Sequence, residues 1–217
     1  MKLLRLILPL VAMATSSLAE KPTPDQYGFA RVVSAVGLES PTRITIGPVK
    51  LLKGNPVPPG GSSGVITLWA GDTTIEVTNE ACDPPVLKEK ITIPGAATVG
   101  VVVYHQFKEV DGMLVPELKF SKLSESEARQ EPQLSVVSLS AKPEVPVTVG
   151  RETVMLNRQR AKKFDAKLKQ TVTITYKGEA IENVEMRQGG HYVVFLYDDL
   201  SNDGLRAVAV HFMKYEI

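Results

Sequence analysis

The chain of 217 residues has one cysteine, Cys82, so it cannot form an internal disulfide. Its folded parts must therefore be held together by the burial of apolar surface. Lysine and arginine together number 25, and aspartate and glutamate number 24. This near balance excludes a strong overall attraction to nucleic acid or to a membrane surface. Any electrostatic function must come from a local cluster of charge.

The sequence also lacks an apolar run long enough to span a membrane. The run over residues 3–14 is short and is interrupted by Pro9, and the basic residues Lys2 and Arg5 lie at its start. Small residues at positions 17 and 19 complete the pattern of an export signal. We therefore expect residues 1–19 to be a signal peptide. The mature chain would have no membrane span and would be periplasmic, with secretion as an alternative.

Short β-type segments fill the mature chain. Residues 192–197 and 205–212 are β-branched and aromatic and flank a loop of Asp, Ser, Asn and Gly, which is typical of an antiparallel hairpin. Residues 99–104 and 113–120 repeat the same arrangement around a loop over 109–112. The two hairpins indicate one β unit that occurs twice.

Further segments match between the two halves in the same order, which favours a duplication. The matched pairs are 32–34 with 136–138, 44–47 with 147–150, 74–77 with 171–174, 101–104 with 194–197, and 111–112 with 203–204. Closely spaced strands with Gly, Pro, Asn and Asp turns and no clear helix point to β-sandwiches. The alternative is one continuous barrel or sandwich across both halves.

We therefore predict an all-β chain with two tandem antiparallel β-sandwich (Ig-like) domains after the signal peptide. The first domain covers residues 20–120, a polar linker covers 121–132, and the second domain covers 133–217. Since the linker lacks an apolar pattern, we expect the two halves to fold separately. Val102 and Val194 should lie in the cores.

No established catalytic or metal-binding pattern is present in the sequence. The GxSxG spacing occurs at residues 60–64, but no helix pattern follows it, so no strand-turn-helix elbow for a nucleophilic serine is predicted. His191 and His211 lie on the two strands of the second hairpin, and they face each other in one register only; a shift of one residue puts His191 opposite Phe212. Two ligands are fewer than a metal site needs, and His105 has no partner in the sequence. We predict no catalytic residues, no metal and no cofactor.

Three other groups of residues are assigned structural roles. Asp198, Asp199 and Asp203 share one loop but lack the spaced oxygen ligands of a calcium loop, which favours a solvated turn. Cys82 is followed by an acid, which does not activate a thiol, so a structural or incidental role is favoured over pairing with another chain. The Gly-Ser-Ser-Gly segment at 61–64 precedes no helix and is interpreted as a flexible loop.

A local excess of positive charge occurs over residues 151–169, where seven basic residues face two acidic ones. A solvated face is the simpler interpretation. The alternative is docking to an anionic partner, either an acidic polysaccharide or an acidic protein surface. Nucleic acid is disfavoured because the chain is expected to be exported and Phe164 is the only aromatic residue in the segment. The candidate partner-binding residues are Arg158, Arg160, Lys162, Lys163 and Lys167.

The sequence phrases at 147–150, 169–174 and 189–196, with the export signal and the two-copy β layout, resemble the F-type accessory proteins of alginate O-acetylation. They are also similar to the broader secreted bacterial tandem β-sandwich repeats of unknown function. The resemblance implies a periplasmic, non-catalytic adaptor that contacts acetyltransferase partners, and it carries over no catalytic residues. The Pro/Gly loop at 53–64 departs from that pattern.

The sequence therefore favours an exported adaptor or binding protein over an enzyme. It would support the O-acetylation of an alginate-like exopolysaccharide by contacting acetyltransferases or the polymer. Two alternatives remain: a carbohydrate-active or esterase-like enzyme whose site is not visible in the sequence, and a structural β-sandwich module of the cell surface.

The export signal predicts a mature chain that starts at Glu20, because cleavage follows the small residues at positions 17 and 19. Mass spectrometry of the exported protein should give the mass of residues 20–217. An intact Met1, or a lipid on the N-terminus, would contradict this prediction.

Overall fold

The computed structural model describes residues 23–125, 130–200, 204–211 and 213–215. The predicted signal peptide and Asp203 lie outside these residues. Within them the chain consists of strands and two short 3₁₀ turns, η1 (Pro24–Gln26) and η2 (Leu51–Gly54). None of the described helices is long and apolar enough to cross a membrane.

The strands fall into two sets of eight, which we call the first and the second repeat. The first repeat contains β1 (Tyr27–Ala35), β2 (Arg43–Ile46), β3 (Val49–Lys50), β4 (Ile66–Trp69), β5 (Gly71–Thr78), β6 (Val86–Ile93), β7 (Thr98–Val110) and β8 (Met113–Glu125). The second repeat contains β9 (Pro132–Ser138), β10 (Glu144–Val149), β11 (Glu152–Asn157), β12 (Ala161–Asp165), β13 (Thr171–Tyr176), β14 (Glu179–Glu185), β15 (Gly190–Asp199) and β16 (Gly204–His211). A last strand, β17 (Met213–Tyr215), follows the second repeat.

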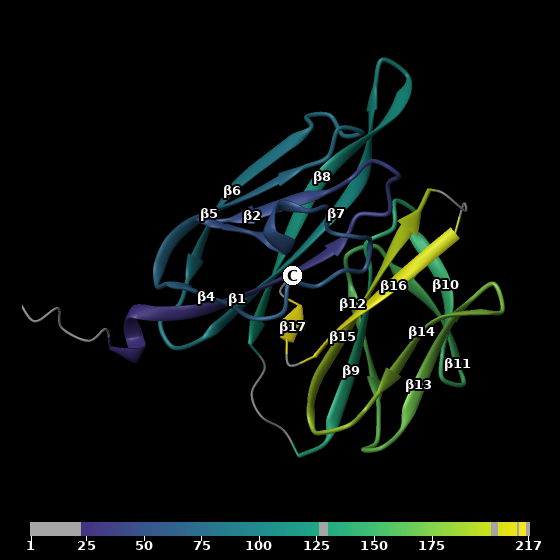
Figure 1. Cartoon of the computed structure of the whole chain (residues 1–217). Coiled ribbons are helices and arrows are strands. Elements are labelled where there is room, and N and C mark those ends of the chain that lie inside the picture. The colour runs from purple at the N-terminus through teal and green to yellow at the C-terminus, as the bar shows by residue number, and fades with distance from the viewer. Residues whose placement is uncertain (1–22, 126–129, 201–203, 212, 216–217) are drawn as a thin grey trace, which may run out of the picture.

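Four sheets are formed, and we number them by their order in the stack (Figure 1). Sheet 1 has the strand order β3-β2-β5-β6, and sheet 2 has β17-β8-β7-β1-β4. Sheet 3 has β12-β9-β15-β16, and sheet 4 has β11-β10-β13-β14. Adding eight to each strand number turns sheet 1 into sheet 4, and turns sheet 2 without β17 into sheet 3. The predicted internal duplication is therefore confirmed.

The strand registers support the duplication residue by residue. Val32 pairs with Val101 in the first repeat, and their predicted counterparts Val136 and Val194 pair in the second. One predicted match is shifted. Ile46 pairs with Ile75 and Val149 pairs with Ile174, so position 75 corresponds to 174 and not to 172. The shift is even, so it leaves each side chain on the predicted face of its strand.

The all-β tandem sandwich is confirmed, but its sheets are not purely antiparallel. β1 pairs with β7 in parallel, and β9 pairs with β15 in parallel. A parallel pair needs a long crossover, which here runs through sheet 1 in the first repeat and through sheet 4 in the second. These four strands are buried on both faces, which explains why their sequences are almost continuously apolar.

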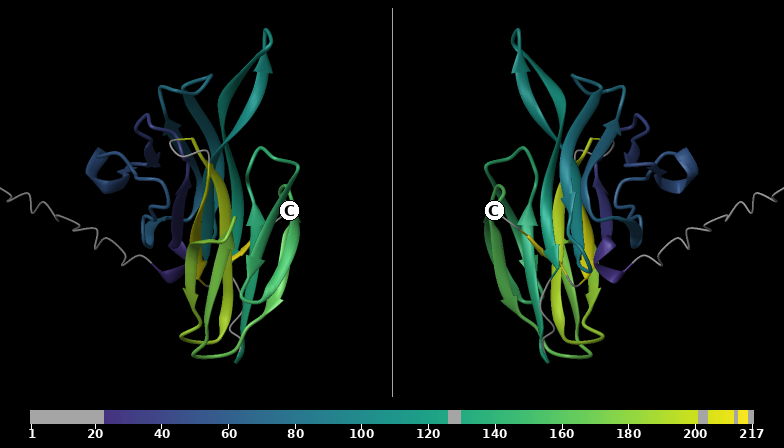
Figure 2. Two further views of the ribbon diagram at one scale, coloured as in Figure 1. Left: turned by 90° about the vertical axis from the view of Figure 1, so that its right-hand side faces the viewer. Right: turned by 90° about the vertical axis from the view of Figure 1, so that its left-hand side faces the viewer.

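Three apolar cores separate the four sheets, which Figure 2 shows from two sides. The first lies between sheets 1 and 2 and includes Val32 and Ile75. The last lies between sheets 3 and 4 and includes Val194. The middle core joins the repeats, because Val102 of sheet 2 and Phe195 of sheet 3 belong to one cluster. Val102 and Val194 are both fully buried, as predicted.

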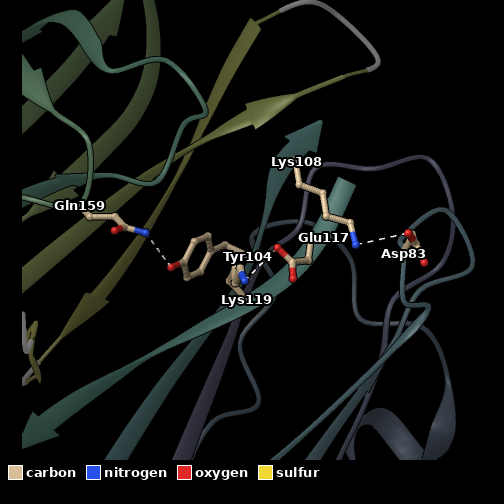
Figure 3. A network of polar contacts seen from close by, with 6 residues as sticks. All are labelled: Asp83, Tyr104, Lys108, Glu117, Lys119 and Gln159. Atoms are coloured by element: carbon tan, nitrogen blue, oxygen red, sulfur yellow. Dashed lines mark hydrogen bonds and ion pairs between the residues drawn. The ribbon is translucent and has the colours of Figure 1, made fainter. Parts of the chain in front are cut away.

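The contacts between the repeats are reciprocal. Tyr104 in the first repeat accepts a hydrogen bond from Gln159 Nε2 in the second, with 3.0 Å between the nitrogen and the hydroxyl oxygen (Figure 3). Its counterpart Tyr197, in the second repeat, packs against Gly60 in the first. The contact is close, because a Cβ added to Gly60 would lie 3.2 Å from the Tyr197 hydroxyl oxygen. Gly60 and Gln159 are themselves equivalent, because their backbone amides donate to the carbonyls of Ser34 and Ser138, respectively. Such an exchange of equivalent contacts is what a twofold-symmetric dimer interface shows.

The predicted linker over 121–132 is shorter in the structure, because β8 continues to Glu125 and β9 begins at Pro132. The repeats are also joined by more than a linker. β17 follows the second repeat, yet it pairs with β8 of the first through Lys214 opposite Ser124. The boundaries of the two domains stay a prediction. Because the repeats share the middle core and β17 belongs to sheet 2, we no longer expect the halves to fold independently.

Replacing Phe195 by alanine tests this coupling. The side chain is fully buried in the core between the repeats, so its loss should cost about 3–5 kcal/mol of unfolding free energy. The only tryptophan, Trp69, is in the first repeat, whereas Phe195 is in the second. In urea, Trp69 fluorescence and far-ultraviolet circular dichroism should shift together to a lower midpoint.

The control is Met155→Ala, which removes a half-exposed side chain from the second repeat and should leave the midpoint unchanged. A fluorescence midpoint for Phe195→Ala that equals the wild-type value, while circular dichroism shifts, would show that the repeats unfold independently.

Candidate functional site

The basic segment at 151–169 is not the exposed connection that the sequence suggested. It contains two strands: β11 lies at the edge of sheet 4, and β12 lies at the edge of sheet 3. Arg160, Lys162, Lys163 and Lys167 are exposed, whereas Arg158 is partly buried. The strand β12, with adjacent lysines at 162 and 163, was not predicted because an edge strand needs few apolar side chains.

The structure does not gather these cations on one surface. Lys162 and Lys163 are adjacent in β12, so their side chains leave opposite faces of sheet 3. Lys162 Nζ lies 3.1 Å from Glu152 Oε1 and 5.6 Å from the centre of the Phe164 ring. The charge of Lys162 is therefore already used within the molecule. Partner binding by Arg158, Arg160, Lys162, Lys163 and Lys167 stays a prediction.

The histidines and the hairpin aspartates do not converge on a ligand. Tyr192 lies opposite His211, so the register is the one in which His191 does not face His211. Asp198 accepts hydrogen bonds from Ser140 Oγ at 2.6 Å and from the backbone amide of residue 141 at 2.7 Å. Asp199 accepts one from Arg206 Nε at 2.6 Å. Both carboxylates are therefore engaged in hydrogen bonds within the protein, so the expected solvated turn is corrected for these two residues. The described residues hold no group of three side chains suited to a metal.

The Gly-Ser-Ser-Gly loop is held against β1, contrary to the expected flexible loop. The Val32 amide donates to Ser63 Oγ at 2.9 Å, and the Ser34 amide donates to the Gly61 carbonyl at 2.9 Å. The serine therefore completes the edge of sheet 2. This hydrogen bonding leaves the segment with a structural role.

Shallow hollows lie along the open edges of the sandwiches. One of about 280 Å³ lies between β6 and β8, where Leu87 and Leu118 are flanked by Glu117 and Lys119. The carboxylate of Glu117 is 2.9 Å from Lys119 Nζ, so the two charges neutralise each other (Figure 3). Lys108 similarly pairs with Asp83 at 3.3 Å. The charges of Glu117 and Lys119 in the hollow between β6 and β8 are therefore paired with each other.

The surface that stands out carries three aromatic side chains at the open end of sheet 2, which we call the aromatic platform: Tyr27, Phe29 and Trp69. Trp69 is 64% exposed, and its ring stacks on Tyr27 with 4.6 Å between the centroids and 27° between the planes. Tyr27 lies directly opposite Trp69 in the ladder, so both side chains leave the same face of the sheet. Phe29 is two residues along β1 and therefore shares that face.

The position of the platform follows from how sheets 2 and 3 overlap. Val33 and Ala35 continue the same face of β1 and are fully buried in the core between the repeats. Phe29 and Tyr27 lie further out and are only partly buried. Sheet 3 therefore covers one end of this face and leaves the other end open to solvent.

The backbone beneath the platform is rigidly fixed. The Tyr27 carbonyl accepts a hydrogen bond from the Ala96 amide at 2.7 Å, and the Gln26 carbonyl accepts one from Ala70 at 2.9 Å. A Cβ on Gly28 would lie 2.0 Å from the Pro94 carbonyl oxygen, so only glycine permits this close packing. The rings are thus held in place before any ligand arrives, which lowers the entropic cost of binding.

Sequence reasoning did not find the platform. Tyr27 and Trp69 are 42 positions apart (69 minus 27), and only the pairing of β1 with β4 brings them together. One pattern in the sequence could have indicated it. Large and small residues alternate over 27–30, Tyr-Gly-Phe-Ala, which in a strand places the aromatic side chains on one face and the small residues on the other.

Comparison with known proteins identifies no family. No family model matches the chain, and no curated protein matches it in sequence at a significant level. Among solved structures, the chain is similar to a family CBM26 module, CBMbc from Eubacterium rectale Amy13K, whose crystal structure contains maltoheptaose. The identity is 10%, the TM-score is 0.26, and the match covers 84% of this chain and 96% of the other. A superposition this loose does not define a shared function.

Cys82 is buried in the core between sheets 1 and 2, and this burial raises the pKa of its thiol to about 11. The structural role favoured from the sequence leads to a test. At pH 8 the native thiol should be protonated and shielded, and an aromatic disulfide reagent should modify it only as fast as the protein unfolds. Added urea should release one fast-reacting thiol per chain. Rapid modification of the native protein would contradict the assignment.

Proposed function

We propose that this chain is a non-catalytic protein that binds a carbohydrate polymer on the aromatic platform. The observation that carries the proposal is the exposed Trp69, which stacks on Tyr27 on a sheet face that sheet 3 leaves uncovered. Exposed clusters of large apolar side chains mark interaction sites in soluble proteins. Fixed, solvent-facing aromatic rings suit the C–H faces of sugar rings, which are apolar, whereas the sugar hydroxyls remain in water.

A binding role is supported by what the polar groups already do. The clustered carboxylates Asp198 and Asp199 are occupied by Ser140 and Arg206. The Ser63 hydroxyl is engaged with the backbone of β1. Each of these polar groups therefore has a structural use within the protein.

We also propose a setting for this binding, which rests on the sequence resemblance and on the expected export. The chain would act in the periplasm, where it would hold an exopolysaccharide, alginate-like in kind, near the acetyltransferases that modify it. A contact surface for such a protein partner is offered by the β7–β8 hairpin, which extends beyond the rest of the molecule in Figure 2. Its tip exposes Met113 and Leu114 by 66% and 71%.

Replacing Trp69 by alanine should weaken the binding of polysaccharides by at least about tenfold, since truncating a central aromatic contact costs about 2 kcal/mol or more. Trp69→Phe should retain part of the affinity. The fold should be preserved, because the side chain is mostly exposed. Affinity electrophoresis against a panel of neutral and acidic polysaccharides measures the effect.

Two control variants accompany Trp69→Ala. Met155→Ala removes an exposed apolar side chain from the second repeat and should bind as the wild type does. The triple charge reversal of Arg160, Lys162 and Lys163 to glutamate tests the basic segment in the same assay. If Trp69→Ala binds like the wild type while the triple reversal abolishes binding, the platform is not the site and the basic segment is.

A further inference from the structure

Arg31 lies at the inner end of the aromatic platform. It follows Phe29 by two residues on β1, so its side chain leaves the same face of sheet 2. Its Nη1 donates to the carbonyl of His211 at 3.1 Å, where the second repeat begins to cover the sheet. The Arg31 side chain is therefore held at the boundary between the open platform and the buried core.

Within the part of the chain that the structure describes, Arg31 has no ion pair, whereas two arginines of the second repeat do. Arg187 lies 2.6 Å from Glu185, and Arg206 lies 2.6 Å from Asp199. Among the described residues no carboxylate pairs with Arg31, and its buried Nε has no hydrogen-bond partner. Burial lowers the pKa of the Arg31 guanidinium. At neutral pH the group nevertheless stays protonated.

A half-buried cation without a counter-ion lowers stability unless a ligand supplies the opposite charge. Removing a guanidinium from water without a counter-ion costs free energy, so such a group is expected where it binds a ligand. Burial, and then the charges of Arg31 and Arg187, lower the pKa of His211, so two cations lie near that side chain. Glu125, an acid on the same face of sheet 2, accepts a hydrogen bond from the Thr98 amide at 2.8 Å.

We propose that Arg31 binds the carboxylate of an acidic sugar in a polymer whose neighbouring rings lie on the aromatic platform. This inference rests on the proposed function and names its substrate class, a polyuronate. A guanidinium presents paired N–H groups that match the two oxygens of a carboxylate. Arg31 lies about 7 Å from Phe29 and about 13 Å from Tyr27 along the strand, a length that suits an oligosaccharide rather than a single sugar.

The test compares a polyuronate with the same polymer after chemical reduction of its carboxylates to alcohols. The wild type should bind the polyuronate at least about tenfold more tightly than the reduced polymer, because a hydrogen bond between two charged groups contributes at least that factor in affinity. Arg31→Met keeps the length of the apolar stem and removes the charge. It should bind both polymers with the affinity of the wild type for the reduced one.

The two proposals fail in different ways. Loss of binding to both polymers in Trp69→Ala supports the platform, and equal binding by Trp69→Ala and the wild type overturns it. If Arg31→Met keeps the wild-type preference for the polyuronate, the role of Arg31 is overturned while the platform stands. A sulfated polymer that binds as tightly as the polyuronate would overturn the assignment of a carboxylate.

Thermal unfolding without ligand provides a readout that separates binding from structure. Because the guanidinium has no counter-ion, Arg31→Met loses only the hydrogen bond to the His211 carbonyl and keeps the packing of the apolar stem, so its unfolding temperature should stay close to that of the wild type. Arg31→Lys should retain part of the preference for the polyuronate, since it keeps the charge and loses the paired donors. A lowered unfolding temperature in Arg31→Met, with equal losses for both polymers, would assign Arg31 a structural role and overturn the proposal.

Discussion

The burial of four strands on both faces is the constraint on which the rest of this structure depends. β1 and β7 in sheet 2, and β9 and β15 in sheet 3, each contribute side chains to two cores. Sheets 1 and 4 complete the outer cores, whereas the middle core exists only because the repeats pack on each other. Without a disulfide, the apolar area buried in these three layers supplies the main favourable contribution to stability.

The reciprocal contacts give a structural role to two loops that are conspicuous in the sequence. The Pro/Gly loop presents Gly60 to Tyr197, and the turn within the basic segment presents Gln159 to Tyr104. Gly60 and Gln159 both have positive φ, at 77° and 58°, so the two loops follow the same path. These loops connect the repeats as equivalent loops connect the subunits of a symmetric dimer. Their composition therefore reflects packing between the repeats.

The pattern of apolar residues was enough to predict the strands of the two hairpins and the duplication. Strands buried on one or both faces contain apolar runs, and turn residues such as Gly, Asn and Asp mark where each run ends. It could not predict which strands pair. The parallel pairing of β1 with β7 brings together residues such as Val32 and Val101, although all the strands of sheet 1 lie between them in the sequence. For the same reason the stacking of Tyr27 on Trp69 could not be predicted from the sequence. The strand β12 was not recognised because its charged residues interrupt the apolar pattern. Pairing between distant segments is set by packing that no short window contains.

The two repeats differ at a pair of equivalent edge strands, β4 and β12. An edge strand exposes unpaired backbone groups, and lysines on it oppose pairing with another sheet. β12 carries Lys162 and Lys163, which suit this protective role, whereas β4 carries Thr67 and Trp69. Positions that both repeats need for packing have stayed apolar, as Val32 and Val136 show. The first repeat has instead placed an aromatic ring on an edge that its counterpart protects with charge, and such a departure from a shared pattern is where a binding function is expected.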